Sequence, residues 1–237
     1  MPGTDTVAIN TSDAFSQEKY IVEHFPYLLG KIVTIPNFVD LDKFTPAHNR
    51  KRRPNPEVMV AATIWPSKNT FGFVDAVAGL KSKGYKFHVS WYGKDESNID
   101  YFNVCQQKIE DLGLNEYLEL KEKTTKINEC YQDADYFCLP SFYEGTPNVI
   151  GEAMACGLPV ACSDVCDNGR YVVENENGVL FNPNDVTSMV NAFENLFNID
   201  DTTYSVYSLS GNDKAKKMLS KETFITSYLT LIEDTRS

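Results

Sequence analysis

Glu144 and Glu152 are two carboxylates whose spacing could serve the binding of a polyhydroxylated ligand. Glu144 follows an apolar run that ends at Leu139, and Glu152 lies eight residues further on. A carboxylate accepts hydrogen bonds from neighbouring hydroxyls. If an anion were bound between the two, the ligand would carry hydroxyls at both ends and phosphate in the middle. A nucleotide sugar has that shape, with a ribose, a diphosphate and a hexose.

A helix start between the two glutamates supplies the anion site. Thr146 is a favourable N-cap and Pro147 suits the first helical position, so we expect a helix over Pro147–Cys156. The free N–H groups and the dipole of a helix N-terminus attract anions, and Gly145 permits close approach of a ligand. On this geometry Glu152 lies ~9 Å along the axis from the cap. The same pattern is common in proteins that bind nothing, so that alternative stays open at this point.

The elements that position these residues alternate between short apolar strands and amphipathic helices. Near-continuous apolar runs such as Val58–Thr63 and Tyr136–Leu139 indicate buried parallel strands. The pattern predicts an α/β fold, a Rossmann-like parallel sheet with helices on both faces. Ligands of such sheets bind at the carboxyl ends of the strands. That rule selects the loop that carries Lys68 and the strand end at Gly93.

Composition narrows the classes of function. The 237 residues carry a net charge of −11, which argues against a nucleic-acid partner but not against a small phosphorylated ligand. No run of ~18 apolar residues and no leader pattern occurs, so a cytoplasmic location is expected. The six cysteines form no C-x-x-C pair and have no histidine nearby. They are expected to be reduced structural thiols rather than metal ligands.

Five ordered motifs carry a resemblance to a known family. The string EGTPNVIGEAMACGLPVACSDV, with its E-x7-E spacing, closely resembles the signature of retaining glycosyltransferase family 4, which has the GT-B architecture. Four further segments match the family in order. They are KIVTIPNFVDLDKF at 31–44, IWPSKN at 64–69, YQDADYFCLPS at 131–141 and NGVLFNP at 177–183. The resemblance covers nearly the whole chain, and the five motifs together are far more specific than E-x7-E alone.

The resemblance implies roles for individual residues. Glu144 would contact hydroxyls of the transferred sugar, and Glu152 would bind the ribose hydroxyls. Lys68 would hold the diphosphate and neutralise charge on the leaving phosphate, although a solvated surface lysine is the plain alternative. Lys68 and Glu144 are thus the expected catalytic residues, and no metal or other cofactor is expected. Backbone groups between the glutamates would contact sugar and phosphate. The expected donor-binding residues are Lys68, Gly93, Glu144, Gly145, Thr146, Pro147, Asn148, Val149 and Glu152.

Two features depart from the family pattern. Many members carry an arginine five residues before the lysine, where this chain has Thr63. Either diphosphate binding depends more on Lys68 and the helix start, or the chain belongs to a subgroup with another arrangement. The chain also begins near the family's crossover region. We expect a remnant strand and helix over 1–30, the nucleotide-sugar-binding domain over 31–220 and a final helix over 221–237.

The predicted partner is a UDP-, GDP- or ADP-sugar. An acceptor domain on the N-terminal side is expected to be missing, any peripheral membrane association would run through that half, and the chain alone would transfer little. The final helix would expose Phe224, Tyr228 and Leu231. Alternatives are a GT-B nucleotide-sugar epimerase and a non-enzymatic nucleotide-sugar-binding module. An NAD-dependent enzyme is disfavoured because no G-x-G-x-x-G follows the first strand.

Overall fold

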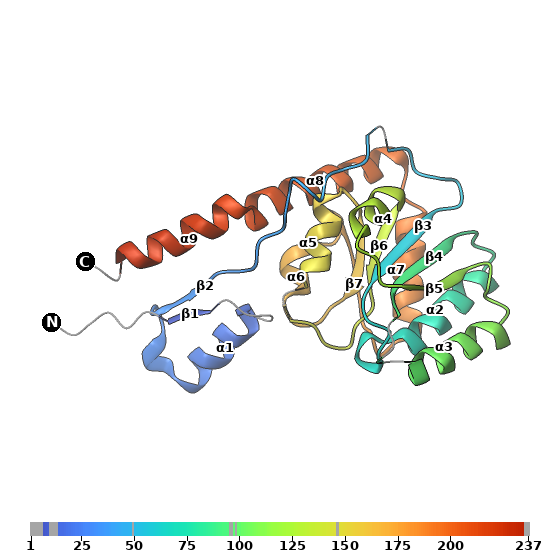
Figure 1. Cartoon of the computed structure of the whole chain (residues 1–237), viewed down its shortest axis with the longest axis horizontal. Helices are drawn as coiled ribbons and strands as arrows, with labels where there is room; N and C mark the ends of the chain where they lie inside the picture. Colours follow the sequence, from blue (N-terminus) through green and yellow to red (C-terminus); the bar gives the residue numbers. More distant parts are fainter. Residues whose placement is uncertain are drawn as a thin grey trace.

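Six short strands form one parallel sheet in the order β5-β4-β3-β6-β7-β8. Their bounds are β3 Glu57–Ala61, β4 His88–Lys94, β5 Leu118–Glu122, β6 Tyr136–Leu139, β7 Val160–Ser163 and β8 Gly178–Phe181. The computed structural model describes residues 7–9, 14–48, 50–94, 97, 99–145 and 147–234 (Figure 1). The predicted parallel sheet is confirmed. The strand order reverses between β3 and β6, and these neighbours form the switch point of the sheet.

Helices cover both faces of the sheet (Figure 1), and each face of the sheet has its own cluster of buried apolar side chains. On one face, Val58, Val60 and Trp91 of the strands pack with side chains of α2 Thr70–Ser82, α3 Ile99–Asp111 and α7 Val186–Phe197, and with Tyr204 and Tyr207 near the start of α8 Asp201–Leu219. On the other face, Met59 and Phe137 pack with helices α4 Ile127–Asp133, α5 Asn148–Ala155, α6 Asn168–Tyr171 and α8 Asp201–Leu219. The alternate residues of β3 therefore face opposite cores, as a strand buried on both sides requires.

A small unit precedes the sheet. Strands β1 Val7–Ile9 and β2 Ile32–Thr34 pair in parallel with each other, and α1 Ala14–His24 and the 3-10 helix η1 Pro26–Leu28 lie between them in the chain. In Figure 1 this unit and α9 Lys221–Asp234 lie on the same side of the six-stranded sheet, beyond α5 and α6. In the part of the chain that is described, no helix combines the length and the apolar character that a membrane crossing needs.

Helix α8 is longer than the sequence suggested. The polar sequence that follows Phe197 favours helical structure only over 214–219, whereas the helix begins at Asp201. Its start is capped by Asp200, whose carboxylate accepts from the backbone N–H of Thr203 at 2.7 Å. Tyr204 and Tyr207 are buried on its inner face, so tertiary packing stabilises a segment of low helix propensity.

The final helix exposes a different set of side chains from the one predicted. Phe224 contacts the rings of Phe38 and Tyr228 at centroid distances of 5.2 and 4.9 Å, so these aromatic rings pack together. The apolar side chains on the exposed surface are instead Ile225, Leu229 and Ile232. Phe224, Tyr228 and Leu231 are half-buried rather than exposed, because the crossover segment before β3 packs against the side of α9 that carries Phe224.

All six cysteines are free thiols. Four of them are buried in the apolar clusters, at positions 105, 138, 156 and 162. Burial raises the pKa of the Cys156 thiol to about 12 and that of the Cys105 thiol to about 11, so both stay neutral and act as small core residues.

Candidate functional site

The loops after β3 and β6 meet at the switch point of the sheet. The 3-10 helix η2 Pro66–Lys68 follows β3, and residues 140–145 follow β6. The backbone N–H of Phe142 donates to the carbonyl of Ser67 at 2.9 Å and joins the two loops directly. Open α/β sheets bind ligands at the carboxyl ends of the strands beside such a reversal, so this edge is the candidate site.

An ion pair stands at the centre of this site. Lys68 Nζ lies 2.6 Å from Glu144 Oε1, and the hydroxyl of Ser141 donates to the same carboxylate oxygen. The Glu144 side chain is 10% exposed and that of Lys68 is 25% exposed. A carboxylate this buried requires a compensating charge and donors, which the two partners supply. The residues predicted to contact sugar and diphosphate therefore occupy one place, while their roles toward a ligand remain predictions.

Glu152 lies in the second turn of α5, with its own set of partners. The hydroxyl of Tyr131 donates to Glu152 Oε2 at 3.0 Å. Burial raises the pKa of the Glu152 carboxyl, and the hydrogen bond from Tyr131 and the positive charge of Lys43 act in the opposite direction. Glu152 is thus a half-buried carboxylate whose charge is supported by two residues from distant parts of the chain.

The start of α5 differs by one residue from the prediction. The helix begins at Asn148, and Pro147 is its N-cap, with φ −77° and ψ 98°. Pro147 was expected as the first helical residue, but its extended ψ places it before the helix. Its carbonyl accepts from the N–H of Ile150 at 3.0 Å. Thr146 lies outside the described residues, so its predicted capping role stays a prediction.

The N-terminal end of α5 carries backbone N–H groups that lack a partner inside the helix. The first N–H groups of a helix, here those of Asn148 and Val149, have no acceptor within the helix. The side chain of Asn148 accepts a long hydrogen bond from Asn37 Nδ2 at 3.5 Å, which brings the crossover segment to the same helix end. Gly145 directly follows the paired Glu144. An anion at this helix start would thus lie between the Lys68–Glu144 pair and α5.

Gly93 has a structural role that the sequence did not reveal. A Cβ atom at Gly93 would lie 1.8 Å from the carbonyl oxygen of Ala62 and 3.0 Å from the Cα of Thr63. The backbone N–H of Ile64 donates to the Gly93 carbonyl at 3.2 Å, so the chain after β3 lies against the end of β4. Gly93 is therefore required for the close approach of two backbones that leads the chain toward Lys68.

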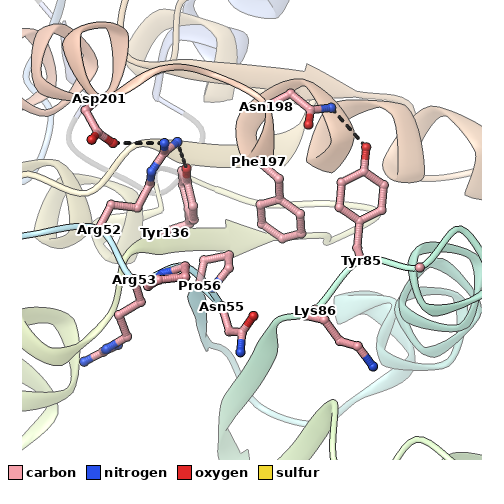
Figure 2. A pocket seen from close by; sticks show the side chains of 12 residues that line it. Arg52, Arg53, Asn55, Pro56, Tyr85, Lys86, Tyr136, Phe197, Asn198 and Asp201 are labelled. Carbon is pink, nitrogen blue, oxygen red and sulfur yellow. Dashed lines mark hydrogen bonds and ion pairs between the residues drawn. The ribbon is translucent and has the colours of Figure 1, made fainter.

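A cavity of about 560 Å³ lies at the other end of the sheet (Figure 2). It is lined by residues just before or at the start of strands, among them Pro56, Lys86 and Tyr136. Its cationic side chains already have partners. Arg52 pairs with Asp201 at 2.9 Å, Arg53 pairs with Asp133 at 2.6 Å, and Lys86 donates to Tyr117 at 3.2 Å. Because it lies at the amino ends of the strands, the cavity is a poor candidate for the donor site.

Sequence reasoning missed several residues that complete the candidate site. Ser141, Tyr131 and Lys43 were not among the predicted site residues, although each falls inside a motif that resembles the family. Their roles depend on side-chain contacts between separate loops and helices, which spacing does not reveal. Within the described ranges, no group of three or more histidine, cysteine, aspartate and glutamate side chains is placed to hold a metal ion.

Comparison with known proteins identifies the class. Residues 55–198 match the family model described as Glycosyl transferases group 1. An Escherichia coli UDP-Gal:alpha-D-GlcNAc-diphosphoundecaprenol alpha-1,3-galactosyltransferase is 30% identical over 198 residues, which are 78% of this chain and 49% of that protein. A D-inositol 3-phosphate glycosyltransferase of Paenarthrobacter aurescens is 27% identical over 192 residues, 75% of this chain and 46% of that protein. The chain belongs to the group 1 glycosyltransferase family, and it spans about half the length of the curated relatives it matches.

Solved structures support the fold assignment. A glycosyltransferase from Rickettsia africae superposes with a TM-score of 0.88 at 17% identity, covering 99% of this chain and 64% of that one. HepE of Anabaena in complex with UDP-glucose superposes with a TM-score of 0.80 at 17% identity, covering 97% of this chain and 64% of that one. The six-stranded sheet with its helices is therefore the Rossmann-like half of a GT-B glycosyltransferase fold, as predicted.

Proposed function

We propose that this chain forms the donor-binding half of a retaining, metal-independent glycosyltransferase of family 4. The observation that carries the proposal is the Lys68–Glu144 pair at the switch point, beside the start of α5. An ammonium, a helix N-terminus and a second carboxylate in the same helix would bind the diphosphate, the transferred sugar and the ribose. The acceptor would be bound by another domain, so this chain alone is expected to bind donor and to transfer little. The expected location is cytoplasmic.

In the absence of donor, two charged side chains of the proposed donor site, Lys68 and Glu144, neutralise each other. In the proposed complex, the diphosphate replaces Glu144 as the partner of Lys68, and hydroxyls of the sugar donate to the carboxylate that Lys68 has left. Each buried charge then keeps a partner throughout binding, which avoids the large cost of an unpaired buried ion. When the bond between sugar and phosphate breaks, Lys68 would stabilise the negative charge that develops on the leaving diphosphate.

The residues of the proposed donor site do not show whether the donor carries uridine, guanosine or adenosine. One relative is named for UDP-Gal, and HepE was solved with UDP-glucose, so a uridine diphosphate sugar is the first donor to test. The other backbone contacts proposed for the donor come from Gly145 to Val149, which include the helix start. GDP- and ADP-sugars are the comparison ligands.

Substitution of the two glutamates should separate their roles. Glu152→Ala is expected to weaken UDP and UDP-glucose binding by a similar factor of ~10, because both ligands carry the ribose. Glu144→Ala should leave UDP binding unchanged or stronger, since Lys68 is released from its partner, while UDP-glucose loses the contact to its sugar. Calorimetric titration of both ligands measures the two ratios.

The exposed Glu119 provides the control. Its side chain is 58% exposed and pairs with Lys121 at 3.1 Å on β5, so Glu119→Ala should change neither affinity. Equal losses of UDP and UDP-glucose in Glu144→Ala would refute the assignment of Glu144 to the sugar. A folded wild-type chain that binds none of the nucleotides or their sugars would refute the proposed function as a whole.

A further inference from the structure

Tyr131 is a buried titratable side chain aimed at Glu152. Its side chain is fully buried, and its hydroxyl lies 3.0 Å from Glu152 Oε2 and 3.3 Å from the carbonyl oxygen of Val149. The hydroxyl has a single proton, and the charged carboxylate at the shorter distance is the stronger acceptor. A side chain of α4 is thus bonded to the first two turns of α5, where the proposed donor site lies.

The surrounding structure fixes the ring of Tyr131. It packs edge-on against Phe44 at a centroid distance of 5.7 Å and tilted against Phe137 at 5.6 Å. The guanidinium of Arg50 donates to the Tyr131 carbonyl at 3.1 Å, which anchors the end of α4 from the other side. A ring held by three separate segments has few alternative rotamers, so its hydroxyl presents one fixed donor to Glu152.

A turn in the crossover segment brings a positive charge to the same carboxylate. The Asp40 side chain accepts from the backbone N–H groups of Asp42 and Lys43 at 3.2 and 3.1 Å, and this turn orders the segment that carries Lys43. The charge of Lys43 lowers the pKa of Glu152, in the same direction as the hydrogen bond from Tyr131.

A further titratable group interacts with this carboxylate from the C-terminal end of α5. It is the thiol of Cys156, the residue that follows the helix, and it stays neutral because burial raises its pKa to about 12. Among the residues that the structure describes, Tyr131, Lys43 and Cys156 are the titratable groups that interact with Glu152, and Lys43 is the charged one of the three.

The raised pKa of Glu152 should make donor binding depend on pH. Burial raises the pKa of Glu152, so the folded chain holds a proton at pH values where the unfolded chain has lost it. The ionised carboxylate therefore reduces stability as the pH rises through this window. A ribose that donates hydrogen bonds to the ionised form would offset that cost, so donor binding should strengthen over the same pH range.

We propose that Tyr131 is a positioning residue of the donor site, whose hydroxyl keeps Glu152 ionised and oriented for the two ribose hydroxyls, with Lys43 supporting the charge. The inference rests on the proposed function. The Tyr131 bond uses one lone pair of Oε2, and a carboxylate has about four acceptor positions, so enough remain for two ribose donors. Tyr131 itself would not touch the donor, because its ring lies entirely within the core.

The test is Tyr131→Phe, with Tyr136→Phe as a matched control. Tyr136 is also fully buried and donates its hydroxyl to a backbone carbonyl, that of Leu196 at 2.9 Å, but it lies at the opposite end of the sheet. UDP-glucose is the ligand, because the terminal phosphate of UDP itself titrates near pH ~6. Affinity is measured by calorimetry from pH 5 to pH 8.5, as a range that brackets the carboxyl titration.

Tyr131→Phe is expected to weaken UDP-glucose binding ~10-fold at neutral pH and to move the acid limb of the binding profile upward by about one pH unit. Lys43→Gln should move the limb in the same direction by less. Tyr136→Phe should change neither affinity nor profile, although it also removes the hydroxyl of a buried tyrosine together with its hydrogen bonds to Leu196 and Arg52.

Carboxyl-carbon NMR of the ligand-free chain gives a second readout, in which Tyr131→Phe should raise the pKa of Glu152 and Tyr136→Phe should not. If Tyr131→Phe does not fold, the pH dependence of UDP-glucose binding and the pKa of Glu152 are measured in Lys43→Gln instead, and both should change in the same direction. A Glu152 pKa and a binding profile that are unchanged in Tyr131→Phe would overturn the inference while leaving the proposed function intact. A folded wild-type chain with no affinity for UDP-glucose would overturn both the inference about Tyr131 and the proposed function.

Discussion

Replacing Lys68 with alanine is expected to lower the affinity for UDP between about 10-fold and 100-fold. A hydrogen bond to a charged group contributes about 1.5–3 kcal/mol, and each 1.4 kcal/mol corresponds to a factor of about ten in affinity. Lys68 follows the carboxyl end of β3 at the switch point and is the cation paired with Glu144 there. If diphosphate binding depends on Lys68 and the helix start because position 63 is a threonine, as one of the two alternatives above has it, the loss should not be compensated. Calorimetric titration measures it.

The same substitution also removes the counter-ion of a buried carboxylate, so affinity and stability must be measured together. Glu144 would retain only Ser141 as its donor among the partners seen here. We therefore expect Lys68→Ala to lower the free energy of unfolding, and Lys68→Ala combined with Glu144→Gln to recover part of it. Lys121→Ala is the control, because its pair with Glu119 is more exposed and should matter little. Undiminished UDP affinity in a folded Lys68→Ala chain would contradict the proposed role.

Introducing a methyl group at Gly93 is expected to destabilise the fold by at least about 3 kcal/mol. The new Cβ would lie 1.8 Å from the Ala62 carbonyl oxygen, far inside van der Waals contact. The obstructing atom is backbone and cannot rotate away. The same carbonyl accepts from Trp91 Nε1 at 2.7 Å, and the next amide, that of Ile64, is bonded to Gly93 itself. Overpacking against mobile side chains costs about 1–3 kcal/mol, so a clash with fixed backbone belongs at or above that range.

Gly211→Ala provides the matched comparison for Gly93→Ala. Gly211 is also buried, but it lies inside α8, and a Cβ there would meet Asn177 and Met154 only at ordinary contact distances of 3.6 and 3.8 Å. Alanine is favoured over glycine in a helix interior by about 1 kcal/mol, so this variant should be neutral or stabilised. Urea unfolding of both variants measures the difference. Similar midpoints for the two would show that the backbone contact at β3 and β4 is not needed.

The sheet could be predicted from the sequence because its strands are short, apolar and bounded by polar loops. Tyr136–Leu139 is bounded as expected, and the helix after it differs by one residue at each end. Helix α8 could not be predicted over its full length. Its interior contains serine, threonine and Gly211, and its stability comes from Tyr204 and Tyr207 packing on the sheet. In this segment the local helix propensity is low, but the tertiary packing favours a helix and determines the structure.

The candidate site was predictable only in part, for a similar reason. The alternation of strands and helices and the carboxyl-end rule lead from the sequence to Lys68 and Glu144 at one edge of the sheet, but not to the bond between them. Tyr131 could be placed in a helix, yet its contact with Glu152 depends on how α4 packs beside α5. The structural need for Gly93 is likewise a property of two backbones in contact, which no single segment reveals.

A titration of the 15N-labelled chain with UDP-glucose, followed through its backbone amide resonances, tests the central claim most directly. We expect the largest shifts at Gly145, Asn148 and Val149 around the start of α5, together with Lys68. Little change is expected around Arg53, Lys86 and Asn198 at the opposite end of the sheet. Shifts concentrated at that opposite cavity, or no shifts at any concentration of the sugar nucleotide, would contradict it.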